Sequence, residues 1–213
     1  MINSIHKHLL YCLLLALIAP VVQAADEFQE GVQYRRLATV VPTSTPGKVE
    51  VIEFFWYGCP HCYRLEPDVD QWLESKPEDV EFVRIPAVFS RNWEPGARAF
   101  YAAQALGVLD RIHGPLMEAI HAKKRPMRTE ADLTAFFVEH GVSKEDFQTA
   151  YNSFDVETKL RRSQQMTKRM GISGVPSIVV GGKYETDVTM AGSGKSVFDV
   201  VNFLVSKEQD AQG

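Results

Sequence analysis

A nearly continuous apolar stretch covers residues 49–57. Its residues are β-branched or aromatic apart from Glu50 and Glu53, a pattern typical of a central strand that is covered on both faces. Gly58 then allows a sharp turn. Apolar residues recur after it at helical spacing, at Leu65, Val69, Trp72 and Leu73. The pattern therefore predicts a buried strand, a turn and a helix with one apolar face.

Two further strands are predicted close to this unit. Residues 80–85 alternate between apolar and polar side chains. With the helix between them, this strand and the first one form a βαβ unit, so we expect the two strands to pair in parallel. Residues 32–41 fit an edge strand that ends at Pro42.

The pattern changes to helical between Glu94 and about Met170, where no strand pattern occurs. Thr129 and Ser143 are expected to cap two of the helices there, and Gly171 is expected to end the last one. The predicted helices of this insertion span residues 97–106, 111–121, 130–139, 144–151 and 155–170.

Strand character returns near the C-terminus. Residues 177–180 and 183–189 flank the Gly181-Gly182 turn and predict a hairpin. Residues 194–207 have valines and a leucine on one side, which predicts a terminal amphipathic helix with Ser193 as its cap.

The first 24 residues have the composition of an export signal. Residues 1–8 are polar, residues 9–19 are apolar, and Val22 and Ala24 lie at positions −3 and −1 of a cut after Ala24. The apolar run is short for a membrane span. We therefore expect a cleaved signal peptide and a soluble exported protein; the alternative is an uncleaved anchor.

Composition narrows the classes of function only a little. The 213 residues are 45% hydrophobic and 23% charged, with a formal net charge of −4. This is ordinary globular composition. It lacks the basic domain expected of a nucleic-acid-binding protein.

Cysteine usage is more informative. Only Cys59 and Cys62 follow the signal segment. In an oxidising compartment, a single CxxC at a strand–helix junction favours a redox role over a structural framework. A closed zinc site needs four ligands, and the histidines are scattered along the sequence, so we expect no metal. Tyr63 stands where a c-type haem motif requires histidine.

The position of the motif predicts its chemistry. We expect Cys59 to be the N-cap of the helix and Pro60 to take the first helical position. The Cys59 sulfur would then face unpaired N–H groups and the positive end of the helix dipole, which favour a thiolate. His61, if charged, adds to this effect. An acidic thiol is a good leaving group, so Cys59 and Cys62 are predicted to form a redox-active disulfide.

Four features together resemble the DsbA family of thiol:disulfide oxidoreductases. They are the strand Glu53-Phe54-Phe55, the motif Cys59-Pro60-His61-Cys62-Tyr63, the helical insertion and the hairpin at Val175-Pro176. The resemblance implies an α/β protein with a thioredoxin fold, in which a central mixed β-sheet is interrupted by an all-helical domain. Its segments would be a signal peptide over 1–24, a thioredoxin-like domain over 25–90 and 171–213, and a helical insertion over 91–170.

The resemblance also implies a function. A monomeric periplasmic oxidase would donate its Cys59–Cys62 disulfide to reduced, newly exported proteins. A DsbB-like quinone-reducing inner-membrane protein would then reoxidise it. A substrate thiolate would attack Cys59 and expel Cys62. No bound cofactor is implied.

Two further positions gain a role from the resemblance. An isolated Val-Pro favours an ordinary trans bond, but together with the CxxC motif we expect a cis bond between Val175 and Pro176, beside the disulfide and available to an extended substrate. Glu53 is expected to be buried and to accept a proton from Cys62. The alternative for Glu53 is a structural salt bridge.

Two other functions stay open. A disulfide isomerase or reductase would use the same chemistry, although isomerases of this compartment usually carry a dimerisation domain ahead of the redox domain. A non-catalytic peptide-binding chaperone would use the groove beside Pro176. Loss of activity without both cysteines would exclude the chaperone.

Overall fold

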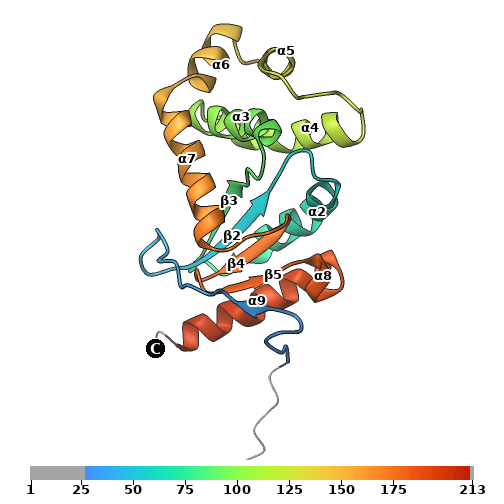
Figure 1. Ribbon diagram of the computed structural model, residues 1–213. Helices are drawn as coiled ribbons and strands as arrows, with labels where there is room; N and C mark the ends of the chain where they lie inside the picture. The colour runs from blue at the N-terminus through green and yellow to red at the C-terminus, as the bar shows by residue number, and fades with distance from the viewer. Residues whose placement is uncertain (1–26, 212–213) are drawn as a thin grey trace, which may run out of the picture.

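Five strands form one sheet in the order β1-β5-β4-β2-β3 (Figure 1). The computed structural model describes residues 27–211. β2 pairs in parallel with β3 and antiparallel with β4, which confirms the predicted βαβ pairing and the mixed sheet. The strands are β1 (Arg35–Arg36), β2 (Val49–Phe55), β3 (Val80–Pro86), β4 (Ser177–Val180) and β5 (Tyr184–Thr186).

Helices α3 to α7 follow one another between β3 and β4, and Figure 1 places α3 to α6 beyond the carboxyl end of β2. The division of the chain at residues 24, 90 and 170 stays a prediction, and residues 1–24 lie outside the described part. The helices are α2 (Pro60–Ser75), the 3-10 helix η2 (Arg91–Trp93), α3 (Glu94–Ala105), α4 (Leu109–His121), α5 (Glu130–Glu139), α6 (Lys144–Tyr151), α7 (Phe154–Arg169), α8 (Val188–Ala191) and α9 (Gly194–Asp210).

The alternation of side chains along β2 divides the core into two layers. Val49 and Val51 pack with apolar residues of α2 and α9 on one face of the sheet. Ile52 and Phe54 pack on the other face with residues around the end of α7, such as Met170. The strand is buried along its whole length, as the nearly continuous apolar pattern predicts.

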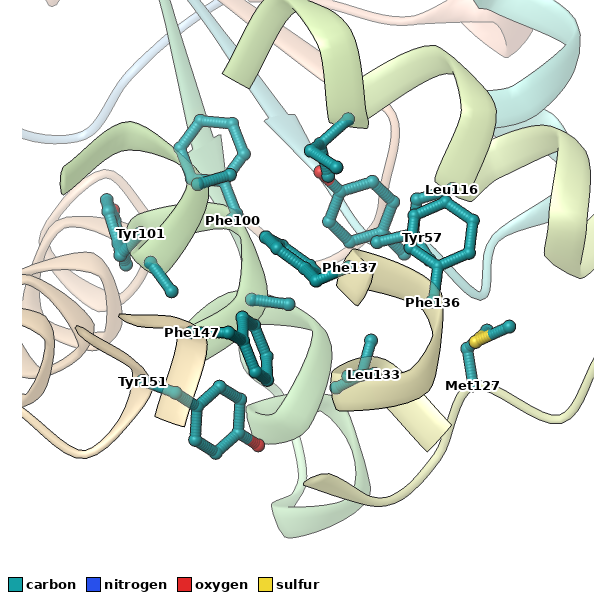
Figure 2. Packing of buried hydrophobic residues seen from close by; sticks show 14 of the residues in the cluster. Tyr57, Phe100, Tyr101, Leu116, Met127, Leu133, Phe136, Phe137, Phe147 and Tyr151 are labelled. Atoms are coloured by element: carbon teal, nitrogen blue, oxygen red, sulfur yellow. The ribbon is translucent and has the colours of Figure 1, made fainter. Parts of the chain in front are cut away.

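A third cluster joins the end of β2 to the helices. Phe55 and Tyr57 pack with the buried side chains of α3 to α6, and Cys59 and Cys62 belong to the same cluster. Figure 2 shows Tyr57 beside Leu116 and the aromatic rings of α5. The helical insertion therefore packs directly against the redox motif.

The predicted edge strand over 32–41 is wrong over most of its length. Only Arg35 and Arg36 pair regularly, with β5. Beyond them, the N–H of Val41 donates to the carbonyl of Gly182 in the hairpin turn. A Cβ on Gly182 would lie 1.9 Å from the Val41 carbonyl oxygen, so this glycine permits a close irregular contact instead of a strand.

The second strand of the hairpin also ends earlier than predicted. It stops at Thr186, and the side chain of Asp187 accepts hydrogen bonds from the N–H groups of Thr189 and Met190. Asp187 thereby caps the short helix α8 and removes residues 188–189 from the strand, because such caps favour a helix start.

The predicted helix caps are confirmed. The side chains of Thr129, Ser143 and Ser193 each accept a bond from the N–H three residues on, and Gly171 follows α7 with a φ of +67°. α3 begins at Glu94, earlier than predicted, with Pro95 in its first turn. Within residues 27–211, no helix combines the length and the apolar character that crossing a bilayer requires.

Candidate functional site

Cys59 takes the N-cap position of α2 and Pro60 follows in the first turn, as predicted, although the Cys59 side chain makes no capping hydrogen bond. As a thiol, Cys59 donates through Sγ to the carbonyl oxygen of Val175 at 3.4 Å. Its exposed fraction is only 7%, so little of this residue is open to solvent.

The two cysteines have opposite acidities. The pKa of Cys59 is lowered to about 6 by a hydrogen bond from the Cys62 thiol, against the effect of burial, and the N–H groups of Cys62 and His61 lower it further. Cys62 is fully buried, and burial together with its hydrogen bond to Cys59 raises its pKa strongly. Cys59 is therefore the thiolate of the pair, while Cys62 keeps its proton. Both are free thiols in this structure.

The bond between Val175 and Pro176 is cis, as expected. Its backbone lies against the motif, because the Val175 carbonyl is the partner of Cys59 Sγ. The structure thus brings together two predicted site segments that are 116 residues apart.

His61 is exposed, and Arg64 Nη2 lies 2.9 Å from its Nδ1. A guanidinium only donates hydrogen bonds. Nδ1 is therefore the acceptor, and this contact fits a neutral imidazole. Where His61 is charged, its charge lowers the pKa of Cys59 further, as the sequence predicted, and the contact with Arg64 then has to open.

Glu53 is fully buried, as predicted. Its Oε2 accepts a hydrogen bond from Arg84 Nε at 3.0 Å, whereas its Oε1 has no partner among the described residues. Burial and the charge of Glu66 raise the pKa of Glu53 to about 8, although Arg84 opposes them. Glu53 is thus protonated at neutral pH while it also contacts a cation. Both interpretations of this residue, proton carrier and salt-bridge partner, have a structural basis.

A chain of polar contacts extends from Glu53 to the helical insertion. Arg84 Nη2 also donates to Glu66 Oε2 at 3.0 Å. Glu66 Oε1 lies 3.1 Å from His113 Nε2, and His113 Nδ1 lies 2.9 Å from the Tyr57 hydroxyl. Burial opposes ionisation of Glu66, but its bond to His113 and the charges of His113 and Arg84 lower its pKa. Glu66 is therefore the ionised carboxylate of the chain.

Helix α4 holds the turn before Cys59 at a second point. His121 Nε2 donates to the Tyr57 carbonyl at 2.8 Å, and its ring stacks on Tyr63 at a centroid distance of 5.0 Å. The Tyr63 hydroxyl donates to Glu118 at 2.6 Å. The same helix thus contacts both the side chain and the backbone of Tyr57.

Sequence reasoning missed this set of supporting residues. The histidines are scattered along the sequence, yet His113 and His121 both reach Tyr57. Their spacing of eight residues on one helix was the available signal, because such positions share a face. Arg84 lies directly opposite Glu53 in the parallel register, and a register is not visible in a single sequence. Within residues 27–211, no group of three or more His, Cys, Asp or Glu side chains could hold a metal ion.

Comparison with known proteins identifies the family. A DSBA-like thioredoxin domain model matches residues 50–202. The thiol:disulfide interchange protein DsbA of Pseudomonas syringae pv. tomato is 39% identical over 189 residues, which cover 89% of this chain and 88% of the relative. That of Azotobacter vinelandii is 40% identical, with 85% of each chain covered.

Solved structures agree with the sequence relatives. The crystal structure of Pseudomonas aeruginosa DsbA matches with a TM-score of 0.84 and 38% identity, over 88% of this chain and 98% of that one. The oxidoreductase DsbA of Xylella fastidiosa matches with a TM-score of 0.80 and 32% identity, over 86% and 98%. The expected thioredoxin fold with a helical insertion is thereby confirmed. The chain belongs to the DsbA-like family of thioredoxin-fold thiol:disulfide oxidoreductases.

Proposed function

We propose that this protein oxidises cysteine pairs in newly exported proteins by donating a Cys59–Cys62 disulfide. The observation that carries the proposal is the contrast in acidity between the two thiols. Cys59 has a pKa of about 6, whereas burial raises that of Cys62 far above its usual range. A disulfide is a good oxidant when the sulfur that the substrate attacks later leaves easily as a thiolate.

The reaction has two steps. A substrate thiolate attacks Cys59 Sγ, the bond to Cys62 breaks, and Cys62 takes the electron pair and a proton. A second substrate thiolate then attacks the substrate sulfur of the mixed disulfide, and Cys59 leaves as a thiolate. The substrate loses two electrons to form its disulfide, and the Cys59–Cys62 pair gains them.

Glu53 supplies the proton in the first step under this proposal. It is protonated at neutral pH because its pKa is about 8. Cys62 is close enough that the carboxylate of Glu53, when ionised, raises the cysteine pKa. Val175 and Pro176 present backbone to the extended substrate beside Cys59. Pro60 and His61 complete the motif, Pro60 by starting the helix and His61 through its N–H.

The test is the reaction of oxidised protein with a reduced two-cysteine peptide. We expect one peptide disulfide for each protein disulfide consumed. Cys62→Ser should accumulate mixed disulfides through Cys59, visible on non-reducing gels, whereas the control Cys59→Ser should form none. A folded Cys62→Ser protein without mixed disulfides would favour the chaperone. An equilibrium with glutathione that favours the oxidised protein would favour a reductase.

The cellular setting belongs to the same proposal. Residues 1–24 would direct export to the periplasm and be removed after Ala24, and a DsbB-like quinone-reducing membrane protein would restore the disulfide of the monomer. N-terminal sequencing of protein from the periplasmic fraction tests the first statement. A start at Ala25 is expected, and an intact Met1 would contradict it.

A further inference from the structure

A cavity of about 580 Å³ adjoins the redox motif on the side of Trp56. Its wall includes Trp56, Tyr57 and Gly58, the three residues that precede Cys59, together with the loop over 124–128 that follows α4. We call it the Trp56 cavity. Because adjacent Cα atoms are about 3.8 Å apart, the cavity begins one residue from the reacting cysteine.

The aromatic wall of the cavity is held in place. The ring of Trp56 stacks on Trp93 at 4.1 Å with an interplanar angle of 4°. A Cβ on Gly58 would lie 2.3 Å from the Trp56 ring, so the indole closes over the backbone of the motif. The wall is thus preorganised rather than formed by a loose side chain.

Three cations and no carboxylate are among the residues that line the cavity. The cations are Lys124, Arg125 and Arg128. Arg125 is already paired with Glu139 at 2.6 Å and 2.9 Å. Lys124 and Arg128 are exposed, and neither side chain has an ion-pair partner in the described residues. Asp132 accepts from the backbone N–H of Arg128 at 3.2 Å but forms no ion pair with the Arg128 side chain. The side-chain cations of Lys124 and Arg128 can therefore meet an incoming anion.

The backbone at Lys124 is unusual for a lysine. Its φ is +56°, and among residues 27–211 every other residue with positive φ is a glycine. The left-handed region is unfavourable for side chains with a Cβ, and glycine is the usual residue there after a helix end. An unfavourable conformation kept at a ligand-facing position is typical of functional sites.

We propose that the Trp56 cavity binds an acidic side chain of the substrate polypeptide, about two or three residues from the cysteine that attacks Cys59. An extended residue spans up to about 3.6 Å, so a side chain two or three residues away lies about 7–11 Å from the attacking cysteine. Such a side chain can enter a cavity whose wall begins at the residue before Cys59. The inference rests on the proposed oxidase function. It makes Lys124 and Arg128 specificity-determining residues for acidic segments.

The test compares two capped peptides with one cysteine each, which differ only by Asp or Asn two residues from it. The rate constant for reduction of the protein disulfide is measured for wild type and for Lys124→Asn/Arg128→Gln. Any difference in peptide cysteine acidity cancels when the Asp/Asn rate ratio is compared between the proteins. Asparagine tolerates a positive φ, so the variant keeps its fold, and Lys124→Gly provides a second variant without the unfavourable backbone.

We expect the Asp/Asn ratio to fall by ~5-fold in the variant, as for the loss of two exposed charge pairs. The effect should shrink in high salt because exposed charges are screened. The matched control is Lys144→Gln/Lys168→Gln, which removes two charges elsewhere and should keep the wild-type ratio. An Asp moved six residues from the cysteine should react like Asn.

Three outcomes would overturn the proposal. The Asp/Asn rate ratio could stay unchanged in the Lys124 and Arg128 variants, it could fall equally in the Lys144 and Lys168 control, or the rate could be the same wherever Asp stands in the peptide. The oxidase function is tested separately by the same data. If wild type oxidises neither peptide, the proposed function fails; if it oxidises both with an unchanged ratio, only the cavity assignment fails.

Discussion

Arg84 donates from Nε to Glu53 Oε2 at 3.0 Å, across the parallel pair β2–β3. Glu53 is close enough to the redox motif to affect the pKa of Cys62. Its own pKa stays at about 8 in spite of the cation, because burial and the charge of Glu66 outweigh it. A buried acid that is neutral at pH 7 can donate a proton, which an ionised one cannot.

The raised pKa of Glu53 makes stability depend on pH. In the unfolded chain a glutamate ionises near pH 4.3, but the folded protein keeps Glu53 protonated up to about pH 8. The unfolded state therefore gains stability between these values, and the free energy of unfolding falls as the pH rises through them. Relative to Glu53→Gln, oxidised wild type should lose stability from pH 5 to pH 8. Urea unfolding measures this, and a constant difference would contradict the raised pKa.

The acidity of Cys59 should depend on the Cys62 thiol, whose hydrogen bond is the largest cause of the lowered pKa. We expect half-maximal alkylation of Cys59 near pH 6 in the reduced protein. Cys62→Ala should raise this pKa by at least ~1 unit because it removes a donor to the charged sulfur. Cys62→Ser keeps a hydroxyl donor and should retain most of the depression. Equal pKa values in the two variants would refute the role of the hydrogen bond.

Reduction should stabilise this fold. The folded pKa of Cys59 lies below its unfolded value, so the stabilisation is complete above about pH 8.5 and is lost as the pH falls towards 6. Its upper limit is ~3 kcal/mol for the difference of about 2.5 pKa units, and solvent screening at this partly exposed site lowers it further. The very short disulfide loop restricts the unfolded chain little. DsbA is an established example of an oxidant with a stabilised reduced form, so this extends a family property.

The measurement is the denaturant midpoint of the oxidised and reduced proteins between pH 5 and pH 9. The advantage of the reduced protein should grow with pH over this range. An oxidised protein that is more stable throughout would contradict the thiolate stabilisation, and a difference that does not vary with pH would assign the effect to another cause.

The contact between Tyr57 and His113 should couple the helical insertion to the redox motif. Tyr57→Phe removes the hydroxyl that lies 2.9 Å from His113 Nδ1. His113→Phe removes the imidazole that contacts both the Tyr57 hydroxyl and Glu66. We expect the second change to cost more, ~2–3 kcal/mol, because it leaves a buried carboxylate less satisfied. A double-mutant cycle should give a coupling energy of ~1 kcal/mol. His140→Gln is the control, because this histidine does not contact Tyr57. If the free-energy effects of the Tyr57 and His113 changes are additive, the contact contributes nothing to stability.

Much of the architecture followed from local rules. The apolar run of β2, the Cys59 cap with Pro60 and the Thr129, Ser143 and Ser193 caps are all predicted from short sequence patterns. These features are local because a strand pattern or a helix cap depends on residues only a few positions apart. The CxxC motif and its place at a helix start belong to the same class.

Tertiary structure decided everything that depends on register and on contacts between distant segments. The short β1 and the early end of β5 depend on the hairpin that they meet. Glu53 meets Arg84 only through the register of β2 and β3, and His113 reaches Tyr57 only because α4 packs over the turn. Strand register and helix packing are set by the whole core, so a single sequence contains them only implicitly. The sequence by itself therefore predicted the redox pair Cys59–Cys62 at a helix start, and the fold decided which distant side chains support it, because Arg84 and His113 reach Glu53 and Tyr57 only through strand register and helix packing.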